Sequence, residues 1–241
     1  MCTLTVIPKG NKDFIITQNR DESPDRKSLL PNIYIGANTK MLFPKDVLSG
    51  GTWIGVSEKK RVVCMLNGAF QNHKRKPNYR KSRGMVTYEF MVSNDVLKMI
   101  DDYNFDGIEP FTMVVVDWND GLKLLELVWD EKNSQVSELP LEPRMWSSST
   151  LYTDAMKAER QQWFNTFKAQ HSLNAKTLLH FHKTAGETND DYGVIMNRGF
   201  VKTTSITQVE KVANKIQMSY EYLGTNKVDL KTFKFPQVVN G

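Results

Sequence analysis

Alternation of apolar and polar positions in the first half of the chain predicts β-structure. Residues 3–7 and 13–17 are rich in β-branched and aromatic side chains, and the Pro-Lys-Gly-Asn stretch between them predicts a hairpin turn. Two further strand pairs are predicted at residues 52–56 with 61–66 and at residues 112–117 with 122–129. The second pair is joined through Asn-Asp-Gly, a strong hairpin signal.

Helical periodicity appears later in the chain. Helices are predicted at residues 85–101, 153–170 and 174–183, and strands return at residues 203–209 and 215–222. Strands and helices are therefore segregated and do not alternate as βαβ units. This order predicts an α+β fold, organised as a single domain over residues 1–241.

Composition places the chain among ordinary globular proteins. Of its 241 residues, 40% are apolar and 24% are charged, and no apolar run reaches membrane-spanning length. The N-terminus lacks the pattern of a signal peptide, and the only cysteines, Cys2 and Cys64, cannot form a disulfide framework, so a cytoplasmic location is expected. The net charge of +5 permits an anionic ligand but does not indicate nucleic acid.

The position of Cys2 raises a chemical question. Removal of Met1 leaves a residue that carries a thiol and a free α-amine together. An α-amine titrates near ~7.7–8.0 and can act as a base at neutral pH, whereas a nearby cation stabilises a cysteine thiolate. If the first hairpin pairs its two strands, Arg20 and Asp21 return beside Cys2. The same residues are also consistent with a small residue at a strand start and a solvated turn.

Several short motifs together resemble one protein family. They are MCTLTVIPKG, NRDES, GGTWIGV, a strand that ends in Leu66-Asn67, and the Lys-Ser-Arg-Gly of residues 81–84 before a helix. This set is similar to the NRDE family, also named for transport and Golgi organisation. That family resembles the cysteine N-terminal-nucleophile hydrolases, which include choloylglycine hydrolases, penicillin V acylases and acid ceramidase.

The resemblance implies a fold and a chemistry. The fold is a four-layer αββα sandwich, in which two antiparallel sheets lie between helix layers. The chemistry is cleavage of a non-peptide amide bond, or a related acyl bond, through an acyl-cysteine intermediate. By position, Cys2 matches the nucleophile, Asp21 the carboxylate that holds its α-amine, and Asn67 an oxyanion-hole donor. Arg20 matches the cation beside the sulfur, although it directly precedes Asp21 here.

Two other matched positions depart from the hydrolase pattern. Ser148 stands where those enzymes carry an asparagine before the central helix, and Lys202 lies where they place a second arginine. A hydroxyl offers one donor, and loss of an oxyanion donor typically lowers the rate by about 100- to 1000-fold. Lys202 keeps the charge of an arginine without its planar fork.

A basic stretch and a pair of histidines are two further candidate sites. Residues 73–83 carry six lysines and arginines and no acidic residue, which is typical of a solvated loop or of a site for an anionic headgroup such as phosphate, carboxylate or coenzyme A. His180 and His182 have no metal-ligating partners at zinc-like spacing, so packing or surface roles are expected. Cys64 is expected to be a buried strand residue, and no cofactor is implied.

Two functions remain open from the sequence. One is an N-terminal cysteine hydrolase that acts on a small-molecule or lipid-like substrate. The other is a non-catalytic carrier on the same scaffold, for a lipid, an acyl-CoA or a haem-like amphiphile. The hydrolase requires removal of Met1, whereas the carrier does not. The sequence sets neither the substrate nor the oligomeric state.

Overall fold

Two antiparallel β-sheets lie face to face in the computed structural model, which describes residues 2–235 and gives only the backbone of Cys2. The six-stranded sheet has, in order, β10 (Arg144–Ser147), β1 (Cys2–Lys9), β2 (Asp13–Glu22), β11 (Lys202–Val212), β12 (Lys215–Tyr222) and β13 (Lys227–Lys234). The seven-stranded sheet has β3 (Ser28–Gly36), β4 (Thr39–Asp46), β5 (Ile54–Ser57), β6 (Arg61–Asn67), β7 (Phe111–Asp117), β8 (Lys123–Trp129) and β9 (Ser134–Leu139).

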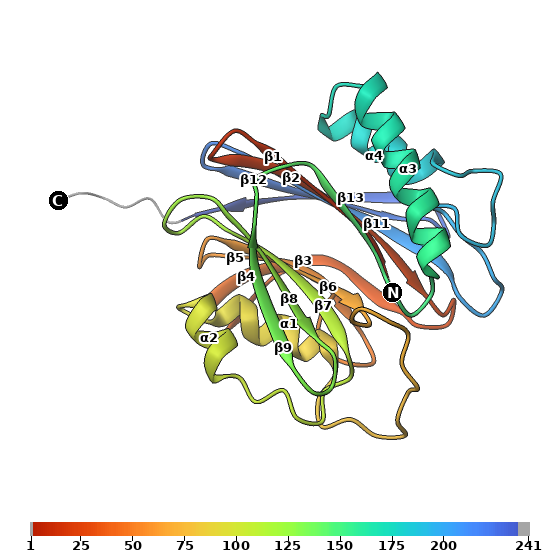
Figure 1. Ribbon diagram of the computed structural model, residues 1–241. Coiled ribbons are helices and arrows are strands. Elements are labelled where there is room, and N and C mark those ends of the chain that lie inside the picture. The colour runs from red at the N-terminus through yellow and green to blue at the C-terminus, as the bar shows by residue number, and fades with distance from the viewer. Residues whose placement is uncertain (1, 236–241) are drawn as a thin grey trace.

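Helices cover both outer faces of this sheet pair. Figure 1 shows α1 (Arg83–Val92) and α2 (Val96–Asp102) against the seven-stranded sheet, and α3 (Asp154–Gln170) and α4 (Ala175–Thr184) against the six-stranded sheet. The predicted α+β fold and its four-layer αββα arrangement are therefore confirmed. None of the described helices is both long enough and apolar enough to cross a membrane.

Three apolar clusters hold the four layers together. The largest fills the space between the sheets and contains Leu4 and Phe14 from the first hairpin. A second joins α1 and α2 to the seven-stranded sheet, and a third joins α3 and α4 to Ile7 and Ile15 of the six-stranded sheet. Even-numbered positions of the first hairpin thus face the other sheet, and odd-numbered positions face the helices, as strand geometry requires.

The predicted helix at residues 85–101 is wrong as a single element, because α1 ends at Val92 and α2 begins at Val96. The break has two local causes. The buried Arg61 guanidinium donates to the carbonyls of Phe90, at 3.2 Å, and of Ser93, at 2.8 Å, so it satisfies groups at the end of α1. Asp95 then starts α2 by accepting hydrogen bonds from two backbone N–H groups in its first turn.

Replacement of Asp95 tests this account of the break. Asp95→Ala removes the N-cap acceptor of α2 and is expected to lower the free energy of unfolding by about 1 kcal/mol in urea titrations. Asp95→Asn keeps a capping oxygen and is expected to lower it by much less. Equal losses in the two variants would contradict a capping role.

Candidate active site

The pairing of β1 with β2 places the N-terminal residues of interest together. Cys2 lies directly opposite Arg20 in the antiparallel ladder, and Asp21 is the next residue of β2. Consecutive residues of a strand face opposite sides of the sheet. Arg20 accordingly contacts groups between the two sheets, whereas Asp21 contacts groups on the helix side.

Arg20 is held rigidly between the sheets and is only 3% exposed. Its guanidinium donates to Asp46 Oδ2 at 2.7 Å and lies 4.4 Å from the ring centroid of Trp53. Burial raises the pKa of Asp46, but hydrogen bonds from Arg26 and from the Ser49 N–H outweigh it and hold this pKa below its usual range. A stable carboxylate therefore fixes the cation that lies across from Cys2.

Asp21 is fully buried on the other side of β2. Its Oδ1 accepts a hydrogen bond from the Thr203 hydroxyl and its Oδ2 accepts one from the Tyr152 hydroxyl, both at 2.7 Å. Burial raises the pKa of Asp21, and the charge of Arg160 with these two hydrogen bonds opposes that rise. Each carboxylate oxygen keeps a lone pair that could accept a bond from an amine.

A buried histidine continues this polar layer between β1, β2 and α4. His182 lies 2.7 Å from Asn19 Oδ1 through Nδ1 and 2.8 Å from the Thr5 hydroxyl through Nε2. Burial, and then the charge of Arg160, lower the pKa of His182 to about 3. The ring is therefore neutral, with Nδ1–H donating to Asn19 and Nε2 accepting from Thr5. This packing role agrees with the sequence expectation for His182, and His180 is exposed.

Asn67 ends β6 at the edge of the same region. Its backbone carbonyl accepts a hydrogen bond of 2.6 Å from the Ser148 hydroxyl. The next residue, Gly68, has a φ of +83°, and a Cβ there would meet Ser149 Oγ at 2.3 Å, so glycine is required for this close approach. Ser148 thus gives its one hydroxyl proton to the Asn67 backbone, which is a different contact from the oxyanion donation that its position suggested.

A cleft of about 290 Å³ opens beside Arg20 and Asn67. Its lining combines both sheets with the basic stretch of residues 73–83. The lining residues are Arg20, Glu22, Arg26, Asp46, Ser49, Thr52, Trp53, Met65, Asn67, Arg75, Pro77, Asn78, Tyr79, Lys81, Ser82, Arg83, Gly84 and Glu109. The basic stretch therefore borders the cleft, as one of its two interpretations requires.

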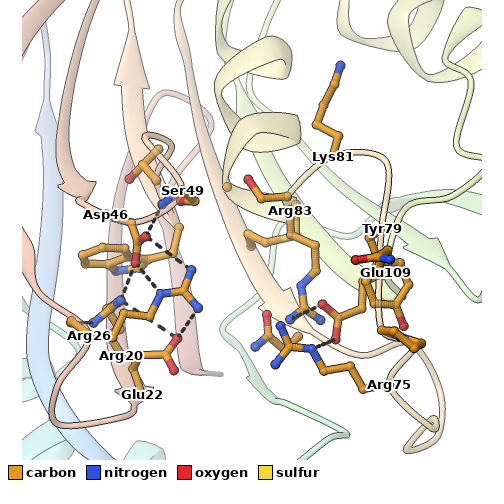
Figure 2. A pocket seen from close by; sticks show the side chains of 18 residues that line it. Arg20, Glu22, Arg26, Asp46, Ser49, Arg75, Tyr79, Lys81, Arg83 and Glu109 are labelled. Atoms are coloured by element: carbon orange, nitrogen blue, oxygen red, sulfur yellow. Dashed lines mark hydrogen bonds and ion pairs between the residues drawn. The ribbon is translucent and has the colours of Figure 1, made fainter.

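Two ion-pair clusters face one another across this cleft, as Figure 2 shows. On one side, Arg20 and Arg26 share Asp46. On the other side, Glu109 pairs with Arg83 at 3.0 Å and with the mostly exposed Arg75 at 3.9 Å. Burial lowers the pKa of Arg83 to about 10, so this arginine remains charged at neutral pH.

Lys202 and Cys64 lie outside the cleft lining in the described part of the chain. Lys202 begins β11 opposite Glu22, whose side chain does line the cleft. Cys64 is a core residue of β6 with 1% exposure, as its strand context predicted.

Three residues around Asp21 were missed by sequence reasoning, namely Tyr152, Arg160 and Thr203. Tyr152 closes the loop before α3, Arg160 lies within α3, and Thr203 pairs with Asp21 across the β2–β11 ladder. Their neighbours in sequence carry no motif that points to Asp21. One signal was present, because Arg160 is a charged residue among the apolar positions of a helix.

Comparison with solved structures identifies the class of fold as that of the N-terminal-nucleophile hydrolases. The N-acylethanolamine-hydrolyzing acid amidase ortholog of Caenorhabditis elegans is similar with a TM-score of 0.58 and 11% identity, over 86% of this chain and 92% of that one. A variant of the conjugated bile acid hydrolase of Clostridium perfringens has a TM-score of 0.54 and 11% identity, over 99% and 100%. Penicillin V acylase of Agrobacterium tumefaciens has a TM-score of 0.53 and 9% identity, over 95% and 85%.

The family follows from the sequence itself. The family model described as Transport and Golgi organisation 2 matches residues 1–231, so the chain belongs to this family. The expected relationship, both to this family and to the hydrolase fold, is confirmed. No curated protein matches the chain.

The buried His182 should make stability depend on pH. Its pKa is lower in the folded than in the unfolded protein, so the unfolded state gains the proton first as pH falls below about 6.5. This group alone should reduce the free energy of unfolding by about 1.4 kcal/mol per pH unit between about pH 6 and pH 4. His182→Gln should remove that slope in urea unfolding measured at pH 6, 5 and 4, whatever its effect at pH 7.

An unchanged slope in His182→Gln would mean that another group causes the acid sensitivity. Asp21 does not mimic the effect, because a carboxyl with a raised folded-state pKa loses stability as pH rises.

Proposed function

We propose that this protein is an N-terminal cysteine hydrolase that cleaves a non-peptide amide bond of a small-molecule or lipid-like substrate. The observation that carries the proposal is the β1–β2 register. Cys2 pairs with Arg20 in this register, Asp21 is the next residue of β2, and the Arg20 side chain lines the cleft together with Asn67. The solved structures with this fold include proteins described as a bile acid hydrolase, an acid amidase and an acylase.

In the proposed reaction, Cys2 becomes the first residue when Met1 is removed. Its thiolate attacks the amide carbonyl carbon, and the α-ammonium gives a proton to the departing amine as the carbon–nitrogen bond breaks. Water then attacks the acyl-cysteine with the α-amine as base, which releases a carboxylic acid and restores the thiol. Asp21 orients the α-amine, and Arg20 favours the thiolate.

Oxyanion stabilisation in this scheme comes from the Asn67 side chain and a backbone N–H. Ser148 contributes indirectly, because its hydrogen bond to the Asn67 carbonyl fixes the end of β6. Lys202 takes no direct part in this scheme and lies opposite Glu22 in the β2–β11 ladder.

The substrate in this proposal carries an anionic group. Within the cleft lining, five cationic side chains from Arg20, Arg26, Arg75, Lys81 and Arg83 outnumber the three carboxylates of Glu22, Asp46 and Glu109. Arg75 has a side chain that is 78% exposed, and its distance to Glu109, 3.9 Å, is longer than the 3.0 Å between Arg83 and Glu109. It can therefore turn to meet a ligand at small cost.

The proposal requires Cys2 to be the first residue of the mature protein and to carry a reactive thiol. Intact mass spectrometry of the purified protein should show loss of Met1, and limiting iodoacetamide should label Cys2 well ahead of Cys64. Cys2→Ala should abolish turnover in a screen of N-acyl amides, since no other group supplies the nucleophile.

Cys64→Ala serves as the matched control, because Cys64 is buried in the core of β6. This variant should keep its turnover per folded molecule. Retention of Met1, or turnover that survives in Cys2→Ala, would exclude the N-terminal cysteine mechanism.

The proposal also requires Arg75 to recognise the anionic group of the substrate. Arg75→Ala should raise KM by about two- to fivefold for an N-acyl amide that ends in a carboxylate, as suits a largely exposed charge. KM for the matched neutral amide should not change. Lys74→Ala removes a charge one residue away and outside the lining, so it should change neither constant. A similar rise for both substrates would argue against charge recognition by Arg75.

A carrier function on the same scaffold is the second candidate. The specific observation in its favour is that the Ser148 hydroxyl proton is already donated to Asn67 and is not free for an oxyanion. A carrier would bind an amphiphile in the cleft without needing removal of Met1. Binding that persists in Cys2→Ala, together with no turnover of any acyl substrate, would favour this function.

A further inference from the structure

Arg160 is a buried cation that the proposed reaction does not use. It lies in α3 with 0% exposure, and no carboxylate within residues 2–235 forms an ion pair with it. A buried charge is costly unless hydrogen bonds and a nearby opposite charge compensate it. The contacts of Arg160 therefore need an explanation.

The guanidinium of Arg160 connects four segments around the N-terminal strand. It donates to the Thr3 hydroxyl of β1 and, at 3.0 Å, to the Ser147 hydroxyl of β10. It also donates to the carbonyls of Tyr192, at 2.5 Å, and Gly193, at 2.9 Å. Thr3 is the residue after Cys2, so Arg160 fixes the backbone at the start of β1.

Arg160 also reaches Asp21 through one intermediate side chain. The guanidinium stacks on the Tyr152 ring, 4.0 Å from its centroid. The Tyr152 hydroxyl donates to Asp21 Oδ2 at 2.7 Å. The buried cation and the buried anion are thus joined by the aromatic side chain that lies between them.

We propose that Arg160 and Tyr152 are positioning residues of the N-terminal site. Arg160 holds the start of β1 through Thr3, and it orients the Asp21 carboxylate through Tyr152 toward the amine of Cys2. This inference rests on the proposed function for the role of Asp21, but its structural claim is measurable without any turnover.

The charges around Asp21 support this arrangement. Arg160 on α3 and Tyr152 before α3 act directly on Asp21, whereas His182 on α4 contacts Asn19 and Arg198 before β11 lies near the Tyr152 ring. Burial, and then the charge of Asp21, raise the pKa of Tyr152 well above its usual value, whereas burial lowers the pKa of His182 to about 3. Neither group changes charge near neutral pH, which leaves Arg160 as the fully buried cation of this network.

The test measures the titration of the Cys2 α-amine. The full chain is prepared with a removable leader whose cleavage leaves Cys2 first, and competitive acetylation with acetic anhydride gives the α-amine pKa by peptide mapping. In the starting protein the carboxylate should raise this pKa above the ordinary ~7.7–8.0. Tyr152→Phe and Arg160→Met should each lower it by about one unit, because a less stable Asp21 carboxylate no longer favours the ammonium.

Two further variants separate positioning from general structural damage. Arg160→Lys keeps the charge but not the fork, and it should restore part of the shift lost in Arg160→Met. Arg198→Met is the matched control, because Arg198 lies 5.8 Å from the Tyr152 ring and donates to the carbonyls of Asp191 and Leu151. It should leave the amine pKa unchanged.

An unchanged α-amine pKa in folded Tyr152→Phe and Arg160→Met, or an equal shift in Arg198→Met, would overturn the inference. Because the titration needs no substrate, this result is independent of whether Cys2→Ala loses hydrolysis. Failure of the proposed function and failure of the positioning role are therefore distinguishable.

Discussion

The register between β1 and β2 is the constraint on which the candidate site depends. A shift of one residue would exchange the faces of Arg20 and Asp21, since side chains alternate along a strand. Arg20 would then enter the helix interface, and Asp21 would enter the cleft. Apolar packing prevents this shift, because Leu4 and Phe14 fill the space between the sheets while Ile7 and Ile15 contact α3 and α4. The same packing that folds the hairpin therefore sets which face of the sheet Arg20 and Asp21 occupy at its open end.

The helix-facing side of this hairpin changes in character along its length. Near the turn, Ile7 and Ile15 make an apolar contact with the helices. Near Cys2, the same face carries Thr3, Thr5 and Asp21, all fully buried. Buried polar groups add little net stability compared with an apolar packing of the same shape. Their concentration at one end of the sheet therefore adds little to the stability of the fold, and it coincides with the proposed site.

Elements fixed by residues close together in the sequence could be predicted, whereas elements that depend on residues far apart in the sequence could not. The first hairpin and the pairing around residues 119–121 follow from local turn chemistry. In contrast, β9 (Ser134–Leu139) is polar and mostly exposed, and it exists because β8 offers an edge to pair with. The short strand β10 lies beside β1 in the same way, although its sequence predicted no strand.

The candidate site shows the same division. Cys2, Arg20 and Asp21 could be brought together from one hairpin, whereas Tyr152 and Thr203 reach Asp21 from 131 and 182 residues away. No local pattern encodes such contacts, because they arise only after α3 and β11 have packed on the sheet. The resemblance suggested roles for Asn67 and Ser148, but only the structure shows that the Ser148 hydroxyl donates a hydrogen bond to the Asn67 carbonyl.

The contact between Ser148 and Asn67 bears on how the site could work. In the proposed mechanism, an oxyanion donor must already point at the charge before it develops. A serine that binds the backbone of Asn67 cannot also donate its proton to the oxyanion, so the asparagine side chain and a backbone N–H have to supply the stabilisation alone. Gly68 permits the close approach of the segment that carries Ser148, which keeps the end of β6 fixed. In the proposed mechanism, a firmly held Asn67 therefore takes the place of the donor that Ser148 does not supply, and the rate of acyl transfer would depend on the position of Asn67.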